Sequence, residues 1–340
     1  MRLQDFDYEL PERLIAQEPL ERRDASRLMV VHRRTGLIEH RLFPAIVEYL
    51  HAGDLMVINE SKVLPVRLLG RKAGTGGQVE VLLLHPTGPD RWECLVRPGR
   101  RLQPGAKLEF GPELQGEVVA RTASGGREVV FAYEDSFESV LARVGHVPLP
   151  PYIKKPLNNA ERYQTVYARS PGSAAAPTAG MHFTPELLAN LRAKGVQIAS
   201  VVLHIGLDTF RPVKVNDITK HEMHTEYYAV PEETSQAVNA AKQEGRRIVA
   251  IGTTSTRCLE SAAGEDGLVR AGAGWSNLFI YPGYRFKVVD ALVTNFHLPR
   301  STLLMMLSAF AGRKLILHAY AEAVKYEYRF FSFGDAMLVL

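Results

Sequence analysis

Polar residues and glycine follow several apolar segments of this 340-residue sequence, at points where strands are expected to end. The four clusters contain Asn59, Ser61 and Lys62; His204, Gly206 and Asp208; Gly252, Thr253, Thr254 and Ser255; and Asn295 and His297. Because ligands of α/β folds bind at the carboxyl ends of strands, we expect these clusters to meet in one pocket. Such a pocket would contain hydroxyls, amides, imidazoles and a carboxylate, which are groups that bind polar substrates and transfer protons.

The cluster Gly252-Thr253-Thr254-Ser255 has the composition of an anion site. We expect it to form a turn between a strand, Arg247 to Ile251, and a helix that begins at Thr256. Glycine would let a ligand approach the backbone, and the hydroxyls and free helix N–H groups could bind a carboxylate or a phosphate. The segment is not a P-loop, because the Gly-Lys-Ser/Thr element is missing. The alternative is that Thr or Ser here only caps the helix.

The segment AAAPTAGMHF, Ala174 to Phe183, places Thr178, Gly180 and His182 just before a predicted helix. Small residues permit close packing against a ligand, and His182 could act as acid, base or hydrogen-bond donor. The alternative is a structural histidine that is fixed in a tight turn.

The segment HEMHTEYY, His221 to Tyr228, has two histidines but not the HExxH order of zinc proteases. If the segment is a strand, His221 and His224 face opposite sides, so we expect no metal site. Glu222, His224 and Glu226 would share one face of that strand. They could serve acid/base chemistry or contact ribose hydroxyls, or they could be a solvated edge.

The C-terminal stretch from Gly274 to Gly312 is expected to position Asn295 and His297. We predict two strands, Leu278 to Tyr281 and Val288 to Val293, joined by a Pro-Gly turn. A helix should follow, capped by Ser301 and ended by Gly312.

Helices and strands alternate over most of the chain, which predicts an α/β fold with a mostly parallel sheet or a barrel-like arrangement. From residue 63 to residue 147 the pattern changes to short alternating strands, with turn residues at about ten-residue intervals, which is typical of a small antiparallel β-barrel. We therefore predict a discontinuous α/β catalytic domain, residues 1–62 and 148–340, and an inserted all-β barrel domain, residues 63–147.

The composition is that of an ordinary soluble globular protein, with 46% hydrophobic and 23% charged residues. No apolar run reaches the ~20 residues of a membrane span, and the N-terminus lacks a signal core, so we expect a cytoplasmic protein without a membrane partner. The two cysteines, Cys94 and Cys258, indicate neither a disulfide framework nor a thiolate metal site. A net charge of +4 permits a nucleic-acid partner without requiring one.

The proline-rich segment from Pro148 to Arg169 interleaves tyrosines with lysines and arginines. Its tyrosines are Tyr152, Tyr163 and Tyr167. Rings among cations suit single-stranded or looped RNA, where bases stack and phosphates need neutralising. The alternative is a solvated linker whose tyrosines attach it to the domain surface.

Blocks along the whole chain resemble those of the S-adenosylmethionine:tRNA ribosyltransferase-isomerase family of bacterial queuosine biosynthesis. They include NESKVLPVRLLG, AAPTAGMHFTPELL, HIGLDTFRPV, GTTSTRCLES and VTNFHLPRSTLL. The sequence departs from the family pattern at Asp208, where glycine is usual, and at Glu60, where aspartate is common. The resemblance implies an α/β domain with an inserted β-barrel. It also implies transfer and isomerisation of the ribosyl unit of S-adenosylmethionine onto 7-aminomethyl-7-deazaguanine at the wobble position of a tRNA, giving epoxyqueuosine, adenine and methionine.

This reaction needs a base that removes a proton from the carbon beside the sulfonium, and an acid that protonates adenine as it leaves. We expect the acid and base among His182, His204, His224 and His297, with Asp208 or Glu222 orienting one of them. Substrate-binding candidates are Thr178, Gly180, Gly252, Thr253, Thr254, Ser255 and Asn295. Of these, Thr253, Thr254 and Ser255 are assigned to the methionine carboxylate or an RNA phosphate. Candidate tRNA contacts are Arg97, Arg100, Arg101, Lys154 and Lys155.

S-Adenosylmethionine would be a substrate, with no prosthetic group and no metal, and a monomer is the expected state. Two alternatives remain open. One is an RNA-binding module without catalysis, which would use the barrel and the tyrosine-containing segment. The other is a metal-dependent hydrolase built on His221 and His224, which lacks a convincing third ligand.

Overall fold

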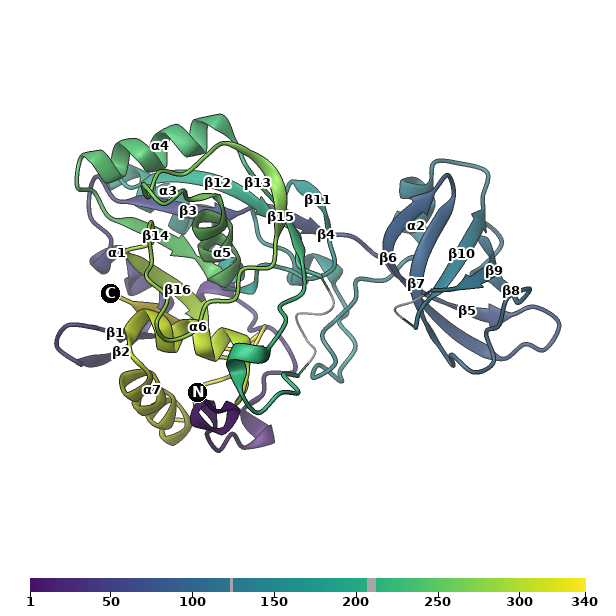
Figure 1. Ribbon diagram of the computed structural model, residues 1–340, viewed down its shortest axis with the longest axis horizontal. Helices are drawn as coiled ribbons and strands as arrows, with labels where there is room; N and C mark the ends of the chain where they lie inside the picture. The colour runs from purple at the N-terminus through teal and green to yellow at the C-terminus, as the bar shows by residue number, and fades with distance from the viewer. Residues whose placement is uncertain (123–124, 207–211) are drawn as a thin grey trace. The chain divides into compact units, whose positions relative to one another are not determined.

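The computed structural model describes residues 1–122, 125–206 and 212–340, so Asp208 lies outside the described residues. The chain divides into two compact units (Figure 1). One unit comprises Met1–Lys62 and Pro151–Leu340, and the other comprises Val63–Pro150.

Within the described residues, the larger unit is built on a nine-stranded sheet. In spatial order its strands are β15 (Gly272–Ser276), β13 (Glu226–Val230), β12 (Gln197–Leu203), β3 (Leu55–Asn59), β14 (Ile248–Ile251), β16 (Ala291–Asn295), β17 (Ala336–Val339), β1 (Arg27–Val31) and β2 (Ile38–Leu42). The central strands β12, β3, β14 and β16 run parallel, and antiparallel pairs add β13 and β15 on one side and β17 on the other. The predicted α/β class is confirmed, with antiparallel strands that make the sheet mixed.

Helices cover both faces of this sheet (Figure 1). One face carries α4 (Glu232–Gln243), α5 (Gly252–Ala262), α6 (Thr302–Ala311) and α7 (Arg313–Lys325), and the other carries α1 (Ile46–Tyr49) and α3 (Pro185–Ala193). Strand β3 shows why both faces are needed. Leu55 and Val57 join the core under α4 and α5, whereas Met56 and Ile58 join the core under α3. A strand that is apolar on both faces has to be covered on both.

Short elements complete this unit. The 3₁₀ helices are η1 (Leu3–Phe6), η2 (Glu12–Leu14), η3 (Arg23–Ala25), η4 (Phe43–Ala45), η5 (Ala160–Tyr163), η6 (Thr178–His182) and η8 (Ile218–Lys220). Strands β4 (Ser61–Val63) and β11 (Ser170–Ser173) form a separate two-stranded pair.

The predicted helix after His297 is confirmed as α6. The Ser301 hydroxyl accepts a hydrogen bond from the backbone N–H of Leu304 at 3.2 Å, and Gly312 ends the helix with a φ of +86°. The predicted strand Leu278 to Tyr281 is wrong, because these residues join no sheet. Phe279 and Tyr281 instead pack their rings against the core of the larger unit without entering a ladder.

The smaller unit contains a closed antiparallel barrel, which confirms the predicted barrel. The predicted all-β composition is wrong, because residues 137–144 form a helix. Around the barrel the strands are β10 (Arg127–Ala132), β7 (Arg91–Arg97), β6 (Gln78–Gly88), β5 (Arg67–Lys72), β8 (Lys107–Glu109) and β9 (Gln115–Arg121), and α2 (Phe137–Val144) follows them. Alternate residues such as Leu68, Val81 and Val118 fill the interior. Arg67 and His146, near the two ends of the insert, form an antiparallel bridge with N–H···O distances of 3.0 and 2.8 Å.

Among the described residues no single helix has the length and apolar character to cross a membrane. Only α6 and α7 taken together reach that length and composition, and they are bent by 117° at their junction.

Candidate active site

A cavity of about 600 Å³ lies in the larger unit, beside the carboxyl ends of β14 and β16. The sequence-predicted residues on its wall are Thr178, Gly252, Thr253, Thr254, Asn295 and His297. They come from η6, the start of α5 and the end of β16. The volume is in the range of small-molecule sites, and polar groups converge on a largely apolar wall that includes Phe296 and Phe331.

His297 is held from two sides within this wall. Its Nε2 lies 2.9 Å from the Thr294 hydroxyl, and its backbone N–H donates to the Tyr320 hydroxyl at 2.9 Å. Burial lowers the pKa of His297 to about 3. The ring is therefore neutral near pH 7, and it can exchange hydrogen bonds with a ligand without bringing a charge into the cavity.

Asn295, at the end of β16, connects the side chains of Thr178 and His182. Its Oδ1 accepts a hydrogen bond from the Thr178 hydroxyl at 3.0 Å, and its Nδ2 lies 3.0 Å from Nε2 of His182. The other ring nitrogen of His182 lies 2.7 Å from the Ser26 hydroxyl, and the ring stacks on Phe43. Burial, with smaller effects from two arginines, lowers the pKa of His182 to about 3. His182 does not line this cavity, and it fixes Asn295, which does.

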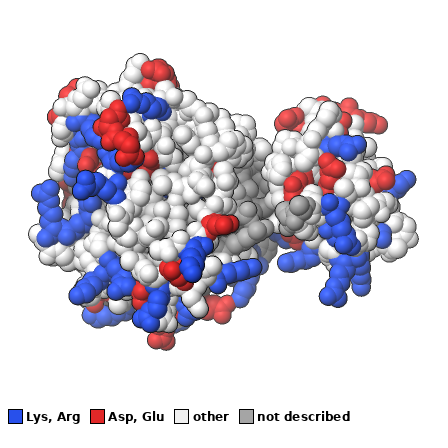
Figure 2. Space-filling model, in the orientation of Figure 1, with Lys and Arg blue, Asp and Glu red and all other residues white. Residues whose placement is uncertain are grey.

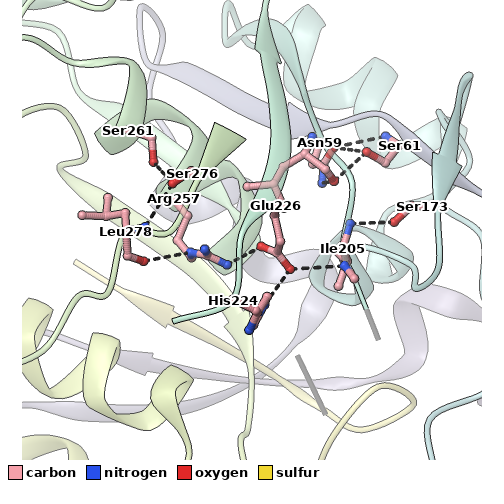
Figure 3. Close-up of polar contacts among 12 residues, drawn as sticks. Asn59, Ser61, Ser173, Ile205, His224, Glu226, Arg257, Ser261, Ser276 and Leu278 are labelled. Carbon is pink, nitrogen blue, oxygen red and sulfur yellow. Dashed lines mark hydrogen bonds and ion pairs between the residues drawn. The ribbon is translucent and has the colours of Figure 1, made fainter. Parts of the chain in front are cut away.

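A buried ion pair forms another part of the wall (Figure 3). Arg257 of α5 pairs through Nη1 with Oε2 of Glu226, and both side chains are almost completely buried. The other oxygen of Glu226 accepts from Nε2 of His224 at 3.1 Å and from the backbone N–H of Gly206 at 3.3 Å. His224 is therefore oriented by a carboxylate that itself lines the cavity.

Arg257 was not among the residues predicted from the sequence, whereas Glu226 was predicted, with Glu222 and His224, to form a face that could serve acid/base chemistry or contact ribose hydroxyls. Arg257 was missed because the helix was predicted to begin at Thr256. The helix begins at Gly252, whose φ of +90° suits glycine, so the expected turn of residues 252–255 is wrong. With the correct start, the i, i+3 spacing of Thr254 and Arg257 would have placed them on one helix face.

Ser255 and Gly180 serve the fold of the protein. The Ser255 hydroxyl donates to the backbone carbonyl of Ile251 at 2.8 Å and is fully buried, so it does not line the cavity. At Gly180 a Cβ atom would lie 1.9 Å from the hydroxyl oxygen of Tyr167. The space beside Gly180 is thus filled by the chain's own tyrosine.

Replacing Gly180 with alanine should lower the free energy of unfolding by about 1–3 kcal/mol, because the new methyl group overpacks the site. The Tyr167 hydroxyl is buried without a hydrogen-bond partner, so Tyr167→Phe alone should be neutral or slightly stabilising. Combining the two should recover part of the loss, which chemical denaturation of the three variants would measure. A Gly180→Ala protein as stable as the parent would contradict this account.

The other predicted catalytic residues lie off the cavity wall. His204 follows β12, its ring stacks on Tyr227 with centroids 5.4 Å apart, and burial lowers its pKa. Only the next residue, Ile205, lines the cavity. Glu222 is exposed to solvent. Of the predicted acid/base residues, the structure therefore places His297 on the wall and His224 against a wall residue.

The tyrosines of the proline-rich segment are packed into the larger unit. Tyr163 is fully buried, and Tyr152 packs on Phe331 with ring centroids 4.4 Å apart. For Tyr163 the use as a stacking surface for RNA bases is therefore wrong, and the alternative, a tyrosine that attaches the segment to the domain, is correct. Tyr152 and Tyr167 are half-buried. Lys154 and Lys155 form ion pairs with Glu12 and Glu18 at 2.5 and 2.8 Å.

The three arginines predicted to contact tRNA, Arg97, Arg100 and Arg101, are exposed on the barrel unit. Arg101 lines a surface cleft of about 580 Å³ together with Lys72 and Lys107. In the view of Figure 2, basic side chains gather along the lower edge of this unit.

The cysteines and the acidic and histidine side chains give no sign of a metal centre in the part of the chain that the structure describes. No group of three or more His, Cys, Asp or Glu there could hold an ion, and Cys94 and Cys258 are buried free thiols.

Comparisons with known proteins give a consistent result along the whole chain. The family model described as "Queuosine biosynthesis protein" matches residues 3–339. S-Adenosylmethionine:tRNA ribosyltransferase-isomerases of Symbiobacterium thermophilum and Pelotomaculum thermopropionicum are 61% and 60% identical over 341 residues, and each match covers 100% of both sequences.

The structure is also similar to the crystal structure of an S-adenosylmethionine tRNA ribosyltransferase from Thermotoga maritima. The TM-score is 0.57 at 44% sequence identity, and the match covers 99% of this chain and 100% of that chain. With a family model that spans nearly every residue and relatives of this identity, the chain belongs to the queuosine biosynthesis protein family.

Proposed function

We propose that this protein transfers and isomerises the ribosyl unit of S-adenosylmethionine onto 7-aminomethyl-7-deazaguanine at the wobble position of a tRNA. The products are epoxyqueuosine in the tRNA, adenine and methionine. The observation that carries this proposal is full-length identity of 61% to an S-adenosylmethionine:tRNA ribosyltransferase-isomerase. The cavity beside β14 and β16 supports it, because it has the size and the polar groups that a small polar donor requires.

The sulfonium of the donor acidifies the adjacent 5′ carbon, so the first step needs a base. His297 is a poor base, because burial favours its neutral form and lowers its pKa to about 3. His224 is better placed, since the Glu226 carboxylate, which itself lines the cavity, accepts a hydrogen bond from its Nε2 and orients the ring. We assign proton abstraction to His224.

Adenine leaves as an anion unless a group donates to it, so the departure needs a hydrogen-bond donor or an acid. We assign this contact to His297, which lies on the cavity wall and is held by Thr294. His182 is assigned a positioning role, because it acts on the cavity through Asn295. No step is assigned to Glu222, which is exposed.

The tRNA needs a basic surface, because phosphate contacts supply most of the affinity of proteins for nucleic acid. We assign this contact to Arg97, Arg100 and Arg101, with the cleft lined by Lys72 and Lys107 beside them. On the larger unit we assign a separate phosphate contact to Lys154 and Lys155, since exposed ion pairs such as theirs are worth only about 0–1 kcal/mol and are exchanged for phosphate at little cost. The protein would act as a cytoplasmic monomer without a prosthetic group.

Release of adenine tests the proposed reaction. The purified protein is incubated with S-adenosylmethionine and a tRNA that bears the deazaguanine precursor, and free adenine and methionine are measured by chromatography. We expect both products only in the complete mixture. One control omits the tRNA, and the other uses a tRNA that has guanine at the wobble position. Tight binding of the tRNA without adenine release would favour the RNA-binding module instead.

A further inference from the structure

Helix α5 begins at the cavity without a side-chain cap. Its N-cap residue, Ile251, has an apolar side chain and makes no capping hydrogen bond. The residues of its first turn, Gly252, Thr253 and Thr254, all line the cavity. The first N–H groups of a helix have no partner inside the helix, and together with the helix dipole they favour a bound anion.

Two side chains on this helix have buried polar atoms without a hydrogen-bond partner among the described residues. The hydroxyl oxygen of Thr254 and Nη2 of Arg257 are both buried, and neither has a hydrogen-bond partner among the described residues. Arg257 as a whole is only 4% exposed. Buried polar groups are nearly always paired, so two unpaired groups on one cavity wall indicate that a ligand completes them.

The two unpaired groups belong to one face of the helix. Thr254 and Arg257 are three residues apart, which makes them neighbours on the helix surface, and both line the cavity. The uncapped N–H groups of the first turn lie at the same end of α5. A single small anion could therefore contact all three elements.

The remaining bonds of Arg257 define the charge of that anion. Its Nη1 pairs with Glu226, and its Nε donates to the backbone carbonyl of Leu278 at 3.3 Å (Figure 3). Only Nη2 is left for a ligand, and the guanidinium charge is already shared with one carboxylate. A singly charged, planar carboxylate suits this arrangement better than a phosphate, which carries more charge than one shared guanidinium can balance.

We propose that Thr254, Arg257 and the start of α5 bind the α-carboxylate in the methionine part of S-adenosylmethionine. This subsite rests on the proposed function, and it adds Arg257 to the donor-binding residues. It also selects the carboxylate over the RNA phosphate as the ligand of Thr253 and Thr254. Because the carboxylate remains on methionine after the ribosyl unit has left, the same contacts would hold the methionine product.

Decarboxylated S-adenosylmethionine provides the test, because it lacks only the carboxylate. The dissociation constants of both compounds are measured by calorimetry with the full-length protein. Charge-assisted hydrogen bonds of a carboxylate to Arg257 and Thr254 should give the parent protein a preference of about 30-fold or more for the carboxylated donor. Equal binding of the two compounds, or binding of neither, would overturn the subsite.

Thr254→Val is the first variant, because valine keeps the shape of threonine and removes only the hydroxyl. The preference for the carboxylated donor should fall about tenfold or more, which corresponds to one lost hydrogen bond to a charged group. Thermal unfolding of the unliganded protein should not change, because that hydroxyl has no partner to lose. Ser255→Ala is the matched control on the same helix and should keep the full preference, since the Ser255 hydroxyl bonds inside the helix.

The second variant combines Arg257→Gln with Glu226→Gln, so that no buried charge is left unpaired. Its preference should fall below about threefold, because the charged donor is gone. An unchanged preference in this variant and in Thr254→Val would overturn the proposal. Adenine release is measured on the same protein preparations. A parent protein that turns over without preferring the carboxylated donor disproves the subsite alone, whereas one that shows the preference but releases no adenine disproves the reaction alone.

Discussion

Turnover of a His297→Ala variant is expected to fall by at least about 100-fold, the usual effect of removing a group that transfers or donates a proton in the transition state. His297 is the histidine that lines the cavity, and Thr294 and Tyr320 hold its ring and its backbone. Alanine removes both ring nitrogens. The measurement is adenine release under single-turnover conditions, with tRNA affinity determined in parallel and expected to stay within about twofold of the parent, because the basic residues assigned to tRNA lie on other parts of the chain.

His204→Ala is the matched comparison for this experiment. His204 stacks on Tyr227 and lies off the cavity wall. The turnover of the His204→Ala variant should therefore fall less than about tenfold. His297→Asn, which retains a polar side chain, separates a loss of chemistry from a loss of folding when thermal unfolding is followed. Equal losses in His204→Ala and His297→Ala, or full activity in the latter, would show that the chemistry takes place elsewhere.

Acid should destabilise this protein well before its carboxylates titrate. His182 and His297 have pKa values of about 3 in the folded state because they are buried, whereas an unfolded histidine has a pKa of about 6.5. The folded protein therefore binds fewer protons than the unfolded chain between these values. Their contribution to stability is complete above about pH 6.5 and is lost as the pH falls. Each histidine should lower the free energy of unfolding by about 2 kcal/mol as the pH falls from 7 to 5.

Chemical denaturation at a series of pH values between 7 and 5 measures this loss. Removing one of the two histidines with His182→Gln, in which the amide oxygen can still accept from Asn295, should reduce the loss of unfolding free energy between pH 7 and pH 5 by about 2 kcal/mol. His51→Gln is the control, because His51 is exposed. A stability that is constant between pH 7 and pH 5 would contradict the buried, neutral state of both rings.

The positions of the strand ends were predictable from the sequence, because apolar segments followed by polar residues and glycine mark them directly. Thr254, Asn295 and His297 were placed on one sheet edge by that rule, and they do line one cavity. The same rule was wrong for the clusters of Asn59 and Ser61 and of His204 and Gly206, which do not line it. The barrel was also predictable from the sequence, because apolar residues alternate along its strands. Leu68 and Val81, for example, lie in its interior.

The sequence did not show which polar side chains would bond within the protein rather than contact a ligand. Glycine and the hydroxyl residues of 252–255 suit a turn as well as a helix start, and only the packing of α5 on the sheet decides between them. Arg257 was missed for that reason. Tyr163 is as compatible with RNA as with a core, and its complete burial follows from long-range packing, which local patterns do not record.

The bridge between Arg67 and His146 has a practical consequence. The bridge holds the two ends of residues 63–150 side by side, and these residues have an apolar core of their own. They therefore have the features of a domain that can fold independently. Residues 63–150 expressed alone should give a folded protein. Its affinity for a tRNA anticodon stem-loop would show how much of the tRNA binding the barrel provides without the cavity of the larger unit.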